Sequence, residues 1–179
     1  MQVLSGISMN SRILIFAVIG IIAIVGGFVL FQQSPPPSGD GSESRMVPDL
    51  SFEDYNGNTV SLRGFIGTPI VVNSWAVWCP FCVKELADFV EVKKEFGDQI
   101  VIISIDRAES LELAKGFTDD LGVTNDLLFL LDPEDSFYRA IGGFSMPETI
   151  FVDSNGVIVD HKRGPMDADE IRERLGAIL

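Results

Sequence analysis

Two cysteines separated by two residues constrain this chain more than any other feature. They are Cys79 and Cys82, and the sequence contains no other cysteine. A strand-type apolar run, residues 69–75, precedes them, and apolar residues follow at helical spacing from Pro80 to about Phe96. A Cys-x-x-Cys pair that opens a helix has an acidic thiol and can close a disulfide. The pattern therefore indicates a strand–turn–helix unit and predicts thiol–disulfide exchange.

The rest of residues 46–179 predicts a mixed sheet with helices on both faces. Period-two alternation on both sides of Asn56-Gly57 indicates a hairpin over residues 51–62. Apolar runs indicate more strands, and helical spacing or capping residues indicate more helices. The strands are expected at residues 100–105, 127–131, 149–152 and 157–160, and the helices at residues 110–121, 135–141 and from 166 onward. Strands joined through helices, then a hairpin and a last helix, indicate an α/β sheet of mixed direction.

An apolar run near the N-terminus, residues 13–31, is long enough to span a bilayer. At roughly 1.5 Å per residue it forms about 28 Å of helix, close to the hydrocarbon thickness. We expect an N-terminal tail at residues 1–12 and an uncleaved transmembrane signal-anchor at 13–31. A removed secretory signal is the alternative, although cleavable apolar segments are usually only about 7–15 residues long. No cysteine lies near the end of the run, which argues against a lipoprotein signal.

The flanks of this run indicate its orientation. Arg12 lies just before it, and basic residues favour the cytoplasmic side. Residues 32–45 contain three prolines followed by Ser, Gly and acidic residues, a composition typical of a tether. If flexible, this linker spans roughly 20 Å on average. The expected location is the plasma membrane, with a single pass and the catalytic domain on the extracytoplasmic side.

The charge of the chain lies in its C-terminal part. The net charge is −13, from 13 basic and 26 acidic residues. Residues 1–45 contain two of each, so residues 46–179 keep 11 basic and 24 acidic residues and the whole net charge. Such acidity excludes nucleic acid and anionic lipid headgroups as partners of this domain. Basic partners and an adaptation to salt or solubility both remain open.

Four segments resemble membrane-anchored thioredoxin-like thiol–disulfide oxidoreductases of the TlpA/ResA/CcmG (DsbE) family. The segments are residues 71–82, Leu131-Asp132-Pro133, Met146-Pro147-Glu148-Thr149 and residues 150–158. The resemblance covers about residues 47–179. It implies a thioredoxin fold, a mixed central sheet flanked by helices with an extra N-terminal β-hairpin. It also implies an enzyme that acts on protein thiols and disulfides without a cofactor.

The cysteines are the expected catalytic residues and the expected redox disulfide. Cys79 lies at the helix N-terminus, where free N–H groups stabilise a thiolate, so it is the better nucleophile. Cys82, one turn inside, would resolve the mixed disulfide. A static disulfide is an alternative, but so local a closure restrains the unfolded chain little. No metal is expected, because zinc needs about four ligands and only His161 could join the cysteines. A c-type haem site needs a His where Val83 stands.

The resemblance also implies supporting residues. Pro147 matches a cis-proline that lies beside the cysteines, and a cis bond after Met146 would prepare that residue to pair with a substrate strand. The ordinary alternative is a trans proline that begins a strand. Glu85 matches an acidic residue that adjusts the cysteine pKa values in ResA-like members, and Glu148 matches a CcmG-like Pro-Glu-Thr. Either carboxylate could move protons or raise a thiol pKa, or be a solvated surface acid.

Three further positions complete the expected site. Asn73 occupies the place of the buried aspartate of ordinary thioredoxins, where an amide cannot accept a proton. Trp75 and Trp78 are expected partly in the core and partly at the rim of the site. His161 is expected on a strand, facing solvent.

The residue before Cys82 indicates the direction of exchange. Phe81 offers no hydrogen bond to the Cys79 thiolate, unlike a His at that position in strong oxidants, which favours the potential of a reductant or an isomerase. The expected task is to reduce specific protein disulfides, for example on apocytochrome c during cytochrome c maturation, with electrons from a membrane thiol donor. Residues 142–145 depart from the family's common sequence, which leaves partner specificity open.

Three other functions are alternatives to this one. A disulfide-forming oxidase would use the same residues at a different potential. A peroxiredoxin needs a Thr three residues before its reactive cysteine, where this chain has Ala76. A non-catalytic thioredoxin-like binding module would carry the cysteines without using them.

Overall fold

Seven strands form one mixed sheet in residues 45–179, the part of the chain that the computed structural model describes. The strands lie in the order β2-β1-β5-β4-β3-β6-β7 across the sheet. Their bounds are β1 Ser51–Asp54, β2 Thr59–Ser61, β3 Ile70–Trp75, β4 Val101–Arg107, β5 Leu128–Asp132, β6 Glu148–Val152 and β7 Ile158–Arg163. The three central strands β3, β4 and β5 are parallel, and the outer pairs are antiparallel.

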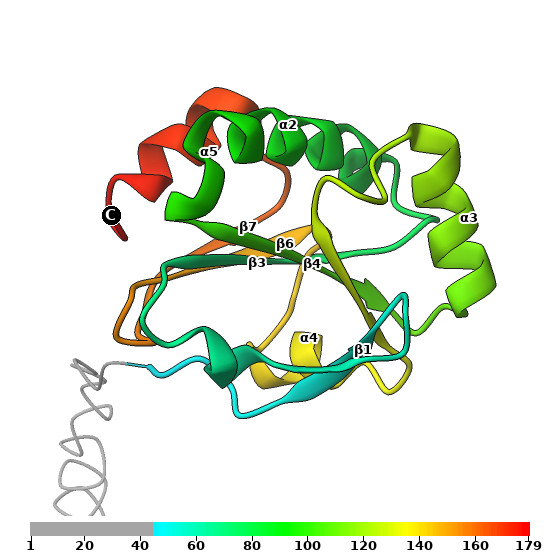
Figure 1. The fold of residues 1–179 in the computed structure, drawn as a ribbon, viewed down its shortest axis with the longest axis horizontal. Coiled ribbons are helices and arrows are strands. Elements are labelled where there is room, and N and C mark those ends of the chain that lie inside the picture. The colour runs from blue at the N-terminus through cyan, green and yellow to red at the C-terminus, as the bar shows by residue number, and fades with distance from the viewer. Residues whose placement is uncertain (1–44) are drawn as a thin grey trace, which may run out of the picture. The chain divides into compact units, whose positions relative to one another are not determined.

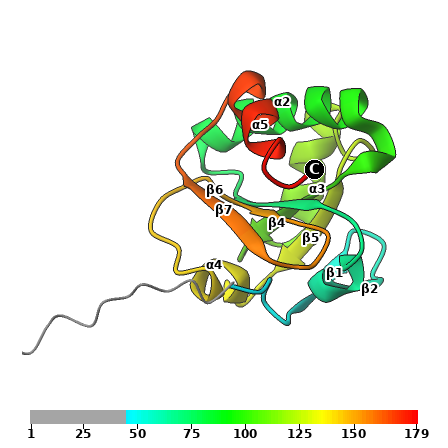
Figure 2. The same ribbon diagram turned by 90° about the vertical axis from the view of Figure 1, so that its left-hand side faces the viewer.

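Helices cover both faces of this sheet (Figures 1 and 2). The α-helices are α2 Pro80–Phe96, α3 Leu111–Leu121, α4 Ser136–Ala140 and α5 Ala168–Leu175, and short 3-10 helices occupy Leu62–Phe65 and Gly97–Gln99. Helices α2 and α5 pack side by side on one face, and α4 lies on the opposite face. We call these the α2 face and the α4 face.

Each face has its own apolar core, because side chains alternate along the strands. In β3, Val71 and Trp75 join the core of the α2 face, whereas Ile70 and Val72 join the core of the α4 face. All of β3 is buried, which explains why it appears in the sequence as an almost continuous apolar run. Both cysteines lie in the core of the α2 face. Strand β3 thus leads directly to the segment that carries the cysteines.

The expected thioredoxin-like α/β fold is confirmed. The hairpin around Asn56-Gly57 forms strands β1 and β2, and β1 extends the sheet by pairing with β5. Strand β7 continues to Arg163, beyond the predicted end at 160. It is the last strand at its edge of the sheet, and its residues beyond 160, His161-Lys162-Arg163, are polar and give no apolar signal.

The predictions for the N-terminus fall largely outside the described residues. These are the tail at 1–12, the transmembrane segment at 13–31 and all of the linker except its last residue. Within residues 45–179, no helix combines the length and the apolar character needed to cross a membrane.

Candidate active site

The two cysteines form a disulfide at the start of α2. The S–S distance is 2.11 Å. Cys79 is the N-cap residue, and its Sγ accepts a hydrogen bond from the backbone N–H of Cys82 at 3.2 Å. Pro80 follows as the first helical residue, where its missing N–H costs nothing. Sequence and helix geometry thus place one sulfur where unpaired N–H groups and the helix dipole stabilise negative charge.

Aromatic side chains surround this turn in two different ways. Trp75 is fully buried and packs its ring against Phe117 and Phe129. Trp78 and Phe81 are 61% and 64% exposed. Trp75 therefore belongs to the core, and the rim of the site is made by Trp78 and Phe81.

A buried carboxyl lies one helical turn beyond Cys82. Glu85 accepts a hydrogen bond on Oε2 from Nδ2 of Asn73 at 3.0 Å, and on Oε1 from the backbone N–H of Met166 at 2.9 Å. Asn73 Nδ2 also donates to Oγ1 of Thr149 at 3.0 Å. Burial raises the pKa of Glu85 to about 8, although the two hydrogen bonds lower it. This carboxyl can therefore bind and release a proton near neutral pH.

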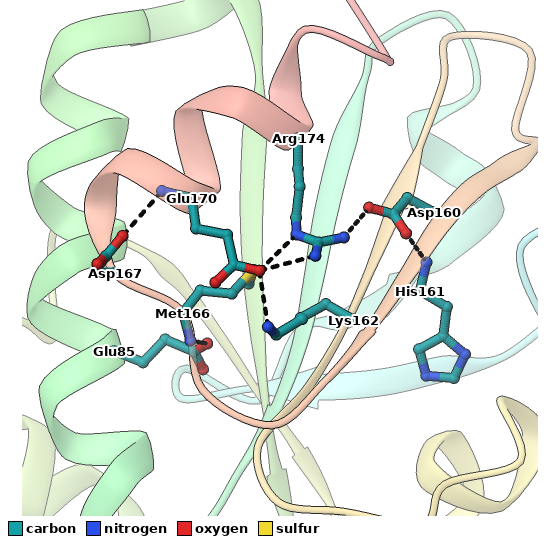
Figure 3. A network of polar contacts seen from close by, with 8 residues as sticks. All are labelled: Glu85, Asp160, His161, Lys162, Met166, Asp167, Glu170 and Arg174. Carbon is teal, nitrogen blue, oxygen red and sulfur yellow. Dashed lines mark hydrogen bonds and ion pairs between the residues drawn. The ribbon is translucent and has the colours of Figure 1, made fainter.

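A network of ion pairs fixes the segment that contacts Glu85. Figure 3 shows Glu85 reaching toward Met166, at the start of the chain that enters α5. Above it, Glu170 accepts from Lys162 at 2.7 Å and from Arg174 at 2.8 Å, and Arg174 also pairs with Asp160. These contacts join β7 to α5. They hold the Met166 backbone where it can meet the carboxyl.

Two further acidic residues near the cysteines, Asp106 and Glu109, are not among those predicted from the sequence. Asp106 is fully buried near the end of β4, and Glu109 donates its backbone N–H to Oδ1 of Asp106 at 3.1 Å. Burial, then the neighbouring Glu109, raises the pKa of Asp106. Glu109 in turn accepts from the backbone N–H of Val77 at 2.8 Å, two residues before Cys79. The pair therefore braces the loop that leads to the cysteines.

One signal could have identified this pair. Asp106 lies at the carboxyl end of a parallel strand, in register with Trp75 of β3. Functional groups of α/β proteins gather at such strand ends. The contact between Glu109 and Val77 spans 32 residues and leaves no pattern in the sequence.

The Met146–Pro147 peptide bond is cis, as the resemblance implied. Met146 packs against the same core as the cysteines. Glu148 follows and is fully buried, with hydrogen bonds from the backbone N–H groups of Phe144 and Ser145 to its Oε1 at 2.5 and 2.6 Å. The structure thus brings Asn73, Glu85 and Met146 into one core with the cysteines, whereas Glu148 binds the preceding loop.

The expectation that His161 faces solvent is wrong. Its side chain is only 14% exposed, and its Nε2 lies 2.7 Å from Oε2 of Glu148. In Figure 3 the ring points away from the ion pairs formed by Asp160 and Lys162. Strand alternation sends it to the opposite face, where it is in register with Ile150.

Among residues 45–179, no cluster of three or more His, Cys, Asp or Glu side chains could hold a metal ion. The chemistry available in the described site is that of two sulfurs and buried carboxyls.

Several known proteins are similar to this chain. A family model described as Redoxin matches residues 42–178. The thiol:disulfide interchange protein DsbE of Vibrio cholerae is 28% identical over 178 residues, 95% of this chain and 95% of that protein. The thiol-disulfide oxidoreductase ResA of Bacillus thuringiensis is 24% identical over 175 residues, 95% of this chain and 99% of that protein. The structure of a DsbF homologue from Corynebacterium diphtheriae matches with a TM-score of 0.67 and 25% identity, over 80% of this chain and 97% of the other.

Proposed function

This chain belongs to the Redoxin family and is a protein thiol–disulfide oxidoreductase, and we propose that it reduces disulfides of specific proteins outside the cytoplasm. The position of Cys79 carries the proposal. Its sulfur caps α2 and accepts an N–H, so the helix stabilises the thiolate that must attack. Pairs of this type react through a mixed disulfide.

The reaction consumes one dithiol and one disulfide. The Cys79 thiolate attacks a substrate sulfur, forms the mixed disulfide and displaces one substrate thiolate, which takes a proton. Cys82 loses its proton and attacks the Cys79 sulfur, which releases the second substrate thiol. Two electrons pass to the substrate, and the Cys79–Cys82 disulfide forms. A thiol donor must then reduce this disulfide before the next turnover.

Glu85 is the proposed acceptor of the Cys82 proton. It lies one turn further along α2 and is buried in the same region. Its raised pKa of about 8 makes the carboxylate form of Glu85 a strong enough base to take a thiol proton near neutral pH. Asn73, which an aspartate replaces in ordinary thioredoxins, serves here as a hydrogen-bond donor to that carboxyl.

The direction of exchange rests on the residue before Cys82. Phe81 has no polar group to stabilise the Cys79 thiolate, and a less stabilised thiolate makes a pair more reducing. The exposed rings of Trp78 and Phe81 support a protein substrate, because aromatic side chains dominate protein contacts. Apocytochrome c during cytochrome c maturation is the proposed example, as in the CcmG-like proteins that the chain resembles.

The proposed location follows from the apolar run at residues 13–31. This run acts as a signal-anchor in the plasma membrane and leaves residues 46–179 on the extracytoplasmic side. The electron donor is then a thiol protein of the same membrane. The linker at 32–45 keeps the cysteines within reach of that donor.

Trapping with cysteine variants of the full-length chain tests the proposal. We expect Cys82→Ser to accumulate a mixed disulfide between Cys79 and a protein partner, because the resolving thiol that would release the partner is lost. Cys79→Ser should trap none and should lose insulin reduction in the presence of dithiothreitol. Full insulin-reducing activity of Cys79→Ser would contradict the assigned nucleophile. A Cys79→Ser, Cys82→Ser double variant is the control for contacts that do not depend on sulfur.

A further inference from the structure

The loop before Pro147 is fixed by contacts that the chemistry of the cysteines does not require. The backbone N–H of Gly143 donates to the carbonyl of Tyr138 at 2.8 Å. Tyr138 donates from its hydroxyl to the carbonyl of Ser145 at 2.9 Å. A Cβ on Gly143 would collide with the Tyr138 ring, so only glycine lets the loop lie this close. Helix α4 thus holds one side of the loop.

Glu148 holds the other side. Its Oε1 accepts two adjacent backbone N–H groups, those of Phe144 and Ser145. Its Oε2 lies 2.7 Å from Nε2 of His161. An ionised carboxylate can only accept, so the ring N–H is the donor in this contact when Glu148 is ionised. Arg163 Nε lies 3.7 Å from Oε1. Both oxygens of this fully buried carboxylate are therefore occupied.

The sheet separates Glu148 from the cysteines. Ile150 and Val152, which share its side of β6, lie in the core of the α4 face. Cys79 and Cys82 lie in the core of the α2 face. The Glu148 carboxyl is thus directed to the loop and to His161, on the face away from the sulfurs.

One side chain of the loop is left free. Phe144 is 85% exposed, although its own backbone N–H donates to Glu148. A single exposed ring is common on protein surfaces. Here it follows from a backbone fixed on both sides, and the exposed Trp78 and Phe81 lie on the segment that carries the disulfide. A side chain presented on a fixed backbone binds with little loss of entropy.

We propose that Glu148 and His161 are positioning residues that fix the loop at 142–147, so that Phe144 acts as a specificity-determining residue for protein substrates. Glu148 then acts on substrate binding and takes no proton from the thiols. The proposal rests on the proposed function only in requiring that the substrate be a protein. It holds for either direction of exchange.

Steady-state kinetics of the full-length chain test this proposal. Insulin serves as the disulfide substrate, with dithiothreitol as the reductant that regenerates the dithiol. The reduced B chain of insulin serves as the thiol substrate for the reverse direction, with oxidised glutathione as the oxidant that regenerates the disulfide. We expect His161→Leu to raise KM for both about tenfold with kcat nearly unchanged, since the loop loses its order before substrate binds. Reaction with the small disulfide 5,5′-dithiobis(2-nitrobenzoate) and the Cys79–Cys82 reduction potential should stay as in the wild type.

Two further variants separate positioning from folding. His161→Gln keeps an N–H donor for Glu148 and should restore KM. Phe144→Ala, on an exposed side chain, should raise KM about as much as His161→Leu, and the double variant should be no worse than either single one. Glu173→Gln, which removes an exposed carboxylate elsewhere, is the charge control.

Other results would overturn the proposal. An unchanged KM in His161→Leu or in Phe144→Ala shows that the loop does not select substrate. Additive effects of the two show that His161 does not act through Phe144. A Glu148→Gln variant with a shifted potential, or a shifted pH profile toward the small disulfide, shows that this carboxyl acts on the sulfurs. A wild type that only oxidises the B chain contradicts the proposed reductant and leaves the KM comparison intact.

Discussion

Asn73 donates a hydrogen bond to Glu85 at 3.0 Å and thereby joins the middle of β3 to the second turn of α2. Both side chains are almost completely buried. The acid proposed to take the Cys82 proton therefore lies on the helix, and the strand supplies its hydrogen-bond donor. In ordinary thioredoxins the buried acid is an aspartate on the strand, at the position of Asn73. Here the strand carries the amide and the helix carries the acid.

Glu85→Gln should flatten the pH dependence of stability. The pKa of Glu85 is raised from 4.5 to about 8 in the folded chain, so the folded state retains a proton that the unfolded state loses. Stability contributed by this group is therefore present below pH 4.5 and is lost as the pH rises toward 8, by up to about 1.4 kcal/mol per pH unit. Urea unfolding of the oxidised chain at several pH values measures the slope, because disulfide-bonded cysteines do not titrate.

Between pH 4.5 and 8, the unfolding free energy of Glu85→Gln should fall less steeply with pH than that of the wild type. The difference should correspond to close to one proton fewer released on unfolding. Asp106 keeps its own contribution in both proteins. Glu173→Gln should keep the wild-type slope. Equal slopes in Glu85→Gln and the wild type would show that Glu85 titrates normally.

Asn73→Ala should raise the pKa of Glu85 further. The Asn73 hydrogen bond lowers that pKa, since it favours the charged carboxylate. Carbon-13 NMR of the Glu85 carboxyl measures the change directly. Asn58→Ala, which alters a surface contact to Asp54, should leave Glu85 as it is. A lower Glu85 pKa in Asn73→Ala is the contradicting result.

Glu109→Ala should loosen the loop before Cys79. The variant removes the acceptor for the Val77 N–H, and we expect a loss of about 1–2 kcal/mol of stability. Amide hydrogen exchange at Val77 should become faster than in the wild type. The pKa of Asp106 should fall, because Glu109 contributes to raising it.

Glu112→Ala, an exposed acid in the first turn of α3, is the matched control for this variant. It should leave exchange at Val77 unchanged. Unchanged exchange at Val77 in Glu109→Ala would mean that the loop is held by other contacts.

The sequence predicted the parts of the site that follow from local patterns. The strand, Pro80 and the cysteines are contiguous, so strand delivery and helix capping could be inferred from order alone. The Asn56-Gly57 turn marked the hairpin in the same way. Glu85 was expected near Cys82, because residues three apart share a side of a helix.

The contacts that depend on pairing between distant strands could not be inferred. His161 lies in the polar second half of β7, where no apolar period marks a face, and only its register with Ile150 shows that it faces the α4 side. Glu85 and Glu148 were expected to serve the cysteines alike. The alternation of β6 separates them, since one residue of register decides which face a side chain joins.

The reduction potential of the Cys79–Cys82 pair tests the central claim most directly. The full-length chain is equilibrated with thiol buffers of defined potential, and the fraction of disulfide is measured. We expect a value near that of thioredoxin, about −270 mV, which places the pair among reductants. A value near about −120 mV, that of a strong oxidant, would contradict the proposed direction of exchange.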